Sequence, residues 1–134
     1  LAAGDRVSSV KTWITVLCAV ALLAGCTKPV DFDQLELRDG LDYFEGKPFT
    51  GVAVEKYKNG QKHVEGTYKD GKQHGLWTRW HENGQKYMEG THKDGKANGM
   101  VTWWYENGQK SLEASYKDDE QISKKEWDRD GKPE

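Results

Sequence analysis

The tetrapeptide Asn-Gly-Gln-Lys occurs three times in this chain, at residues 59–62, 83–86 and 107–110, with a constant spacing of 24 residues. Asn-Gly is the strongest short-range signal for a β-hairpin, because a type I′ turn needs positive φ at both central residues. A hairpin signal that recurs at a fixed period indicates a repeat architecture. We therefore predict type I′ turns at three structural positions: Asn59-Gly60, Asn83-Gly84 and Asn107-Gly108. A repeated surface favours a binding role over a single chemical site.

Three units of equal length can be overlaid, at residues 51–74, 75–98 and 99–122. Each opens with a glycine, continues through an apolar or aromatic run, turns at Asn-Gly and returns through a second strand. Alternation in the returning strands places on one face the residues Val64, Met88, Leu112, Gly66, Gly90, Ala114, Tyr68, His92 and Tyr116. The small residue in the middle of this face leaves room for a bulky Trp or Tyr from the outgoing strand.

The repeats predict an all-β fold, an elongated single twisted antiparallel meander of β-hairpins preceded by a signal helix. Residues 26–36 contain Pro29 and acidic residues and are expected to be a tether, so the repeat domain spans residues 37–134. Turn-like sequences at 38–40 and 44–47 and a strand-and-turn pattern at 127–132 resemble degraded repeat units. Such partial units are expected as caps that protect the ends of a repeat array.

The N-terminal segment has the pattern of a signal peptide. Residues 12–24 are almost all apolar, follow Lys11 and are too few for a comfortable membrane span. The sequence Leu-Ala-Gly-Cys at 23–26 resembles the bacterial lipobox. That resemblance implies cleavage after residue 25, acylation of Cys26 and anchoring at the bacterial outer membrane, facing the periplasm. The alternatives are an ordinary signal peptide with an incidental cysteine, or a buried helix. We also expect Val10 to be the true initiator, which would make residues 1–9 an annotation artefact.

Composition narrows the classes of partner. The formal net charge is −2, so no basic excess supports nucleic-acid binding. Hydrophobic residues make up only 35% of the chain, which is little for a hydrophobic core. The tryptophans compensate for this low apolar content, because each supplies a large apolar area.

The segment Tyr-Lys-Asp-Gly-Lys-Gln-His-Gly-Leu-Trp at 68–77, followed by Glu-Asn-Gly-Gln at 82–85, resembles the MORN-repeat variant. This variant occurs in bacterial proteins often labelled YwqK-type antitoxins, and the resemblance covers about residues 37–132. It implies an elongated antiparallel meander that serves as a scaffold for partner proteins. The standard pattern has a second glycine where this chain has Ala53, Trp77 and Val101. The lipid binding ascribed to eukaryotic members is therefore not carried over.

Polar residues that could suggest chemistry repeat with the units. His81 and His92 stand where sister repeats have Tyr, His63 is expected on the outward face and His74 in a turn, so no metal site is expected. The ladder Glu65, Glu89 and Glu113 is interpreted as structural, with Lys62, Lys86 and Lys110 as cross-strand partners. Serine and cysteine nucleophiles lack a recognisable setting and the glycines fall in turns. We expect no enzyme and no cofactor.

The aromatic side chains are the candidates for function. Trp103 and Trp104 are adjacent and must point to opposite faces of a strand. The candidate surface comprises Trp77, Trp80, Trp103, Trp104, Tyr57 and Tyr105, for which core filling is the competing interpretation. We expect a lipid-anchored, non-enzymatic scaffold or protein-binding module of the cell envelope, with an unidentified envelope protein as partner. The alternatives are a toxin-neutralising (antitoxin or immunity) protein and a glycan- or peptidoglycan-binding protein.

Overall fold

The computed structural model describes residues 28–134, so the predicted signal segment and Cys26 lie outside the described residues. One sheet has eight strands in the order β1-β5-β6-β7-β8-β9-β10-β11, and a second sheet has the order β2-β3-β4. The elements are β1 (Val30–Asp31), the 3₁₀ turn η1 (Phe32–Gln34), β2 (Glu36–Arg38), β3 (Leu41–Phe44), β4 (Lys47–Pro48), β5 (Gly51–Lys56), β6 (Lys62–Lys69), β7 (Lys72–Trp80), β8 (Lys86–Lys93), β9 (Lys96–Trp104), β10 (Lys110–Lys117) and β11 (Glu120–Glu126).

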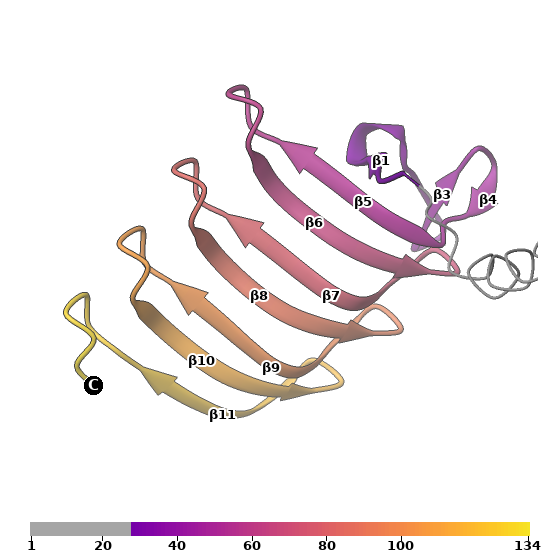
Figure 1. The fold of residues 1–134 in the computed structure, drawn as a ribbon. Coiled ribbons are helices and arrows are strands. Elements are labelled where there is room, and N and C mark those ends of the chain that lie inside the picture. Colours follow the sequence, from indigo (N-terminus) through magenta and orange to yellow (C-terminus); the bar gives the residue numbers. More distant parts are fainter. Residues whose placement is uncertain (1–27) are drawn as a thin grey trace, which may run out of the picture.

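The large sheet is a meander of stacked hairpins, which confirms the predicted all-β fold. From β5 to β11 every strand pairs antiparallel with its neighbours in sequence. The two sets of turns form rows at opposite ends of the strands (Figure 1). The exception to the meander is β1, which pairs parallel with β5 at the first edge.

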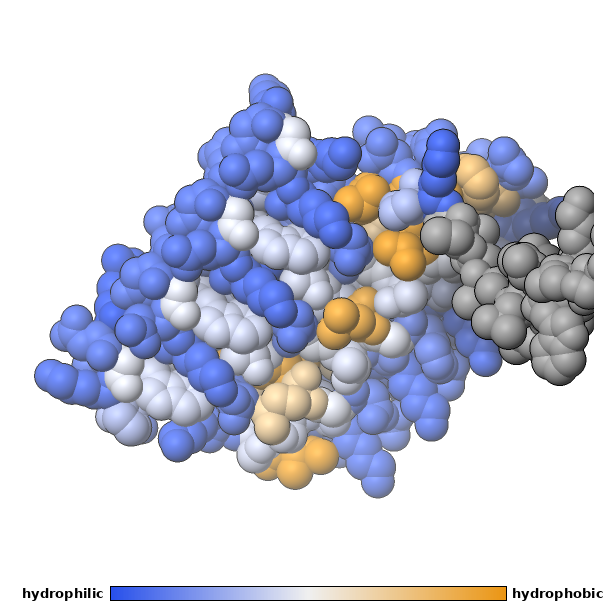
Figure 2. All heavy atoms as spheres, viewed as in Figure 1, coloured by the Kyte–Doolittle hydropathy of each residue, from blue (hydrophilic) through white to orange (hydrophobic). Residues whose placement is uncertain are grey.

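The sheet has two distinct faces, which we call the capped face and the outer face. The capped face carries Val64, Gly66 and Tyr68, and the outer face carries Glu65 and Thr67. The register confirms the expected alternation. Figure 2 shows the repetition of side chains from hairpin to hairpin, with hydrophilic groups between paler ones and a broken line of apolar groups.

The small residue of the capped face lies opposite a tryptophan, as predicted, in the first unit; Gly90 and Ala114 instead pair with Val101, so the prediction of a Trp or Tyr is wrong at those two positions. Gly66 pairs with Trp77, and a Cβ atom at Gly66 would lie only 2.3 Å from two carbons of the indole ring. In the next unit Gly90 pairs with Val101, and its Cβ atom would be 2.9 Å from a Val101 methyl. The indole therefore occupies the volume that the missing side chain of Gly66 leaves.

The core lies under the N-terminal segment. Phe49, Ala53, Val64, Tyr68 and Trp77 are buried on the capped face, and the partly buried residues packed against them are Val30, Phe32, Leu35, Phe44 and Met88. The segment 26–36 is therefore not a tether throughout, because Val30, Phe32 and Leu35 pack on the core. The capped face is covered over the first repeats.

The turns differ from the prediction in one respect. Asp70-Gly71 and Asp94-Gly95 have positive φ at both residues, as a type I′ turn requires. In the Asn-Gly turns only the glycine does, so the predicted type I′ conformation is wrong at Asn59, Asn83 and Asn107. There the Gly60 N–H donates to the Tyr57 oxygen at 2.9 Å, which describes a three-residue loop that ends in a left-handed glycine.

The asparagine side chains hold these loops and link them to each other. The Asn83 Oδ1 accepts the Gln85 backbone N–H at 2.9 Å, and the Asn83 Nδ2 donates to the Glu106 backbone oxygen in the next loop at 3.0 Å. Asn59 and Asn107 make the same two types of contact. The turns therefore form a hydrogen-bonded ladder along one end of the sheet.

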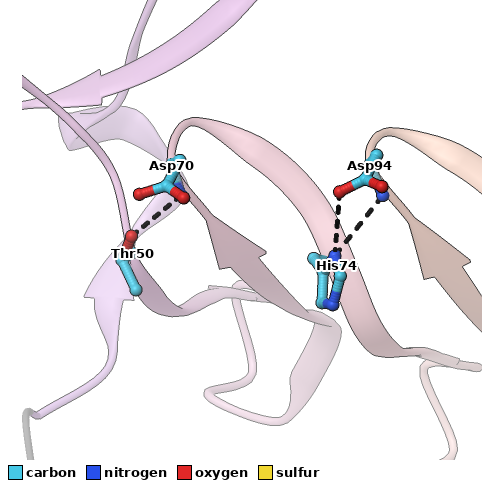
Figure 3. Close-up of polar contacts among 4 residues, drawn as sticks. All are labelled: Thr50, Asp70, His74 and Asp94. Atoms are coloured by element: carbon cyan, nitrogen blue, oxygen red, sulfur yellow. Dashed lines mark hydrogen bonds and ion pairs between the residues drawn. The ribbon is translucent and has the colours of Figure 1, made fainter.

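The opposite row of turns is linked in a similar way (Figure 3). The Asp70 N–H donates to Thr50 Oγ1 at 2.8 Å, and in the next unit Asp94 contacts His74 Nδ1 with both its N–H and its carboxylate, each at 3.4 Å. His74 replaces Thr50 one period later and keeps its position beside the turn. The contact of His74 with Asp94 is therefore the repeat equivalent of the contact between Thr50 and Asp70.

Both ends carry degraded units, as expected. Asp39-Gly40 and Glu45-Gly46 have positive φ at both residues and join the strands of the small sheet. At the other end the Gly131 N–H donates to the Asp128 backbone oxygen at 3.0 Å. This repeats the backbone hydrogen bond of the Asn-Gly loops, with Asp130 in the place of the asparagine.

Candidate binding surfaces

The candidate tyrosines at the Asn-Gly loops connect neighbouring hairpins. Tyr57 donates its hydroxyl to the Trp80 backbone oxygen at 2.7 Å, and Tyr105 donates to the Trp127 oxygen at 3.0 Å. His81 takes the same position in the middle unit, with Nε2 3.1 Å from the Trp104 oxygen. This confirms that His81 substitutes for a repeat tyrosine. Tyr57 and Tyr105 thus have a structural role in joining the repeats.

Trp80 and Trp104 lie on the outer face under lysine side chains. The Lys62 Nζ is 5.4 Å from the centroid of the Trp80 ring and 2.5 Å from Glu65 Oε2. The arrangement repeats at Lys86, Trp104 and Glu89, and again at Lys110, Trp127 and Glu113. The indoles are thus partly covered by the chain's own cations.

The glutamates pair with the predicted lysines, but within a strand and not across strands. A β-bulge explains the difference. Lys56 pairs with Lys62 and Glu55 with Val64, so His63 is an extra residue without a partner. The extra residue brings Lys62 onto the face of Glu65. It also places His63 on the capped face, 3.4 Å from Glu55, and the prediction that it faces outward is wrong.

The other candidate tryptophans divide between the core and the capped face. Trp77 is only 5% exposed, so it is not a surface residue. Its ring fills the space above Gly66, and core filling is the correct interpretation for it. Trp103 pairs with Met88 and Leu112 on the capped face, whereas Trp104 lies beneath Lys86 on the outer face. The predicted opposition of the two tryptophans is confirmed.

The same bulge in the second unit produces a surface that alternation alone does not predict. Arg79 pairs with Met88 and Trp80 with Lys86, which leaves Tyr87 as the extra residue. Tyr87 is 42% exposed and lines a hollow together with Trp103, Ser111, Leu112, Tyr116 and Gln121. We call Tyr87, Trp103, Leu112 and Tyr116 the aromatic shelf. A count of residues between the Asn-Gly turn and Met88 is the signal that could have revealed Tyr87.

Equivalent positions in the first unit are covered. Tyr68 corresponds to Tyr116, and it is 5% exposed because Phe32 and Phe49 pack against its ring at centroid distances of 6.3 and 5.5 Å. Burial raises the pKa of Tyr68 to about 12. Val64 is likewise buried, whereas its counterpart Leu112 is partly exposed. The shelf is the uncovered continuation of a surface that the N-terminal segment covers elsewhere.

His92 lies between the covered and uncovered parts. Its ring is 5.7 Å from that of Trp77, and its Nδ1 is buried without a hydrogen-bond partner. Burial lowers the pKa of His92; Asp119 acts in the opposite direction and Arg79 in the same one. The imidazole therefore serves as a neutral aromatic ring in the place of Tyr68 and Tyr116.

Residues 28–134 contain no group of three or more His, Cys, Asp or Glu residues placed to hold a metal ion. Within that part of the chain, helices of the length and apolar character needed to cross a membrane are absent.

Three segments match the model of the MORN repeat variant family, at residues 49–70, 73–94 and 97–118. They recur with the period of the Asn-Gly loops and together span β5 to β10. Comparisons with curated proteins and with solved structures gave no match.

Proposed function

Because this chain is a MORN-repeat protein, a repeat scaffold or binding module, we propose that it holds a protein partner on the aromatic shelf without transforming it. We further propose that acylated Cys26 anchors it in the bacterial cell envelope. The anchor rests on the resemblance of residues 23–26 to a lipobox, and the binding role rests on the repeat surface.

The observation that carries the binding proposal is the contrast between equivalent positions. Tyr68 is buried under Phe32 and Phe49, whereas Tyr116 borders an open hollow with Tyr87 and Trp103. Aromatic rings that are partly exposed and grouped supply large contact area at low entropic cost. Surfaces of this composition are typical of sites for a protein segment.

The adjacent tryptophans provide a matched test. Acylated full-length protein is purified from envelopes, and the captured proteins are quantified by mass spectrometry for Trp103→Ala, Tyr87→Ala and Trp104→Ala. We expect the two shelf variants to lose the partner by about tenfold or more, because a central aromatic contact contributes roughly 2 kcal/mol or more. Trp104→Ala removes an equal side chain from the outer face and should retain the partner.

Three results would contradict the proposal. Loss of the partner on Trp104→Ala alone would move the site to the outer face. Retention of the partner by both shelf variants would exclude the shelf. Binding of the wild-type protein to purified sacculi, with no protein captured, would make the ligand a glycan. Tyr87→Ala guards against an effect on folding, because Tyr87 is exposed in a bulge.

A further inference from the structure

The Asn-Gly loops are chemically reactive as well as structural. Glycine after asparagine favours deamidation, because without a Cβ atom it leaves its own backbone nitrogen open to attack the preceding side-chain amide. The row of loops at one end of the strands contains three such dipeptides (Figure 1), and all three asparagines are exposed to water: Asn59, Asn83 and Asn107. Each loop is therefore a candidate modification site.

The reaction at Asn83 shows which groups take part. The Gly84 backbone nitrogen loses its proton to the solvent and forms a bond to Asn83 Cγ. The bond between Cγ and Nδ2 breaks, and Nδ2 leaves as ammonia with a proton from the solvent. Water then opens the succinimide ring at either carbonyl, which gives aspartate or isoaspartate. Both products carry a carboxylate in place of the neutral amide, and isoaspartate also lengthens the main chain of the loop by a methylene group.

Both reacting nitrogens are held in the folded loop. The Gly84 N–H donates to the His81 backbone oxygen at 2.9 Å, and the Asn83 Nδ2 donates to the Glu106 backbone oxygen at 3.0 Å. The Asn83 Oδ1 accepts the Gln85 backbone N–H, so rotation of the amide breaks both of its contacts. The attack on Cγ therefore requires a local opening of the loop.

The backbone oxygen that holds each leaving amide belongs to the loop that follows in the chain. Asn59 Nδ2 donates to the Glu82 oxygen at 3.3 Å, and Asn107 Nδ2 donates to the Arg129 oxygen at 2.9 Å. The contact of Asn83 with Glu106 has the same direction. Damage to one loop should therefore release the asparagine of the loop before it and leave the other asparagines held.

We infer that the three Asn-Gly loops are deamidation sites and that each following loop suppresses the reaction. A loop that first has to break two hydrogen bonds reacts about 5- to 100-fold more slowly than the unfolded chain. Isoaspartate at Asn107 displaces Glu106, the acceptor of Asn83, so modification passes along the row toward Asn59. Asn83 and Asn107 also line a hollow with Tyr87, so the new carboxylates stand beside the aromatic shelf. This chemistry does not depend on the proposed binding role.

Two glycine variants separate the loops. Gly84 and Gly131 have φ of +85° and +80°, a backbone conformation that alanine adopts only with strain. Gly84→Ala disturbs the loop that holds Asn59, and Gly131→Ala disturbs the loop that holds Asn107. We expect Gly84→Ala to accelerate deamidation at Asn59 by about 5- to 30-fold and to leave Asn107 unchanged. Gly131→Ala should have the reverse effect.

The rates are measured by peptide mass spectrometry of the full-length protein after incubation in mildly alkaline buffer, with and without guanidinium chloride. Circular dichroism verifies that the variants are folded, and either variant alone decides the question if the other does not fold. The dipeptide Asn98-Gly99 lies within β9 and outside the row, so its rate should follow neither variant.

Three results would overturn the inference. The first is an equal rate at the loop asparagines in the folded and the unfolded protein. The second is a folded Gly84→Ala variant in which Asn59 reacts no faster than in the wild-type protein. The third is an equal acceleration at Asn59 and Asn107 in either variant, because that would reflect a general loosening of the fold and not the loss of the following loop.

Discussion

Replacement of Gly66 by alanine tests the packing at the centre of the capped face. The added Cβ atom would lie 2.3 Å from two carbons of the Trp77 ring, far inside van der Waals contact. The indole has little room to yield. Its ring is 5.7 Å from Phe32, 5.6 Å from Tyr68 and 5.7 Å from His92, and only 5% of the residue is exposed.

The expected change in the free energy of unfolding of Gly66→Ala follows from two opposing effects. Overpacking a well-packed core costs about 1–3 kcal/mol. Replacing glycine by alanine also reduces the backbone freedom of the unfolded chain, which stabilises the folded state by about 0.4–1 kcal/mol. We expect Gly66→Ala to lower the free energy of unfolding by about 2 kcal/mol, which for a domain of about 100 residues lowers the Tm by roughly 10 °C.

Gly90→Ala is the matched control for this substitution. Its Cβ atom would lie 2.9 Å from a Val101 methyl, and a valine requires a smaller displacement than an indole. Neither glycine has the left-handed backbone, so strain does not separate the two variants. Urea unfolding followed by circular dichroism should give a loss of about 1 kcal/mol or less for Gly90→Ala, with unchanged m values.

A double variant tests whether the indole is the cause. The chain already pairs Ala114 with Val101 in the last full hairpin, so Gly66→Ala with Trp77→Val copies a combination that this sheet accommodates. We expect the double variant to be more stable than the sum of the single effects, with a coupling of about 1–3 kcal/mol. Additive effects, or equal losses for Gly66→Ala and Gly90→Ala, would refute the packing argument.

Two further predictions concern the turns and pH. Asn83→Ala removes the acceptor for the Gln85 N–H and the donor to the Glu106 backbone oxygen, so thermal melts should show a loss of about 1–2 kcal/mol in the free energy of unfolding. Asn83→Asp keeps the acceptor and should recover part of this loss. An Asn83→Ala variant as stable as the wild-type protein would contradict the role of the ladder. Burial lowers the pKa of His92 from 6.5, so the unfolded chain takes up the proton first, and stability should be complete above that pH and fall as the pH drops through and below it. His92→Tyr should flatten this dependence in urea midpoints measured from about pH 5 to pH 8, and an unchanged slope would exclude His92 as its source.

The sequence predicted the faces of the returning strands because each hairpin places the same residue types at the same depth. The predicted Trp or Tyr opposite the small residue is found for Gly66, which faces Trp77, whereas Gly90 and Ala114 face Val101. The conformation of the Asn-Gly loop was not predictable. Glycine supplies the left-handed residue in a type I′ turn and also in a three-residue loop, and asparagine serves either as a turn residue or as an acceptor for the backbone.

The prediction of a tether is wrong for residues 30–35, for a related physical reason. Residues 26–36 read as a tether because Asp31 and Asp33 make them polar, and two paired residues are too few for a strand signal. Phe32 decides their place, since its ring finds Tyr68 and Trp77 only after the hairpins are assembled. Contacts that depend on distant parts of the chain leave no local pattern in the sequence.

The bulge has the largest consequence for the candidate site. Strand side chains alternate with a period of two, so one extra residue reverses the faces of everything on one side of it. Alternation counted back from Met88 assigns Tyr87 to the outer face, beside Glu89. The extra residue instead brings Lys86 to Glu89 and turns Tyr87 toward Trp103 and its hollow. The aromatic shelf therefore depends on a local break in the rule that otherwise identifies the fold, and such breaks concentrate at functional sites.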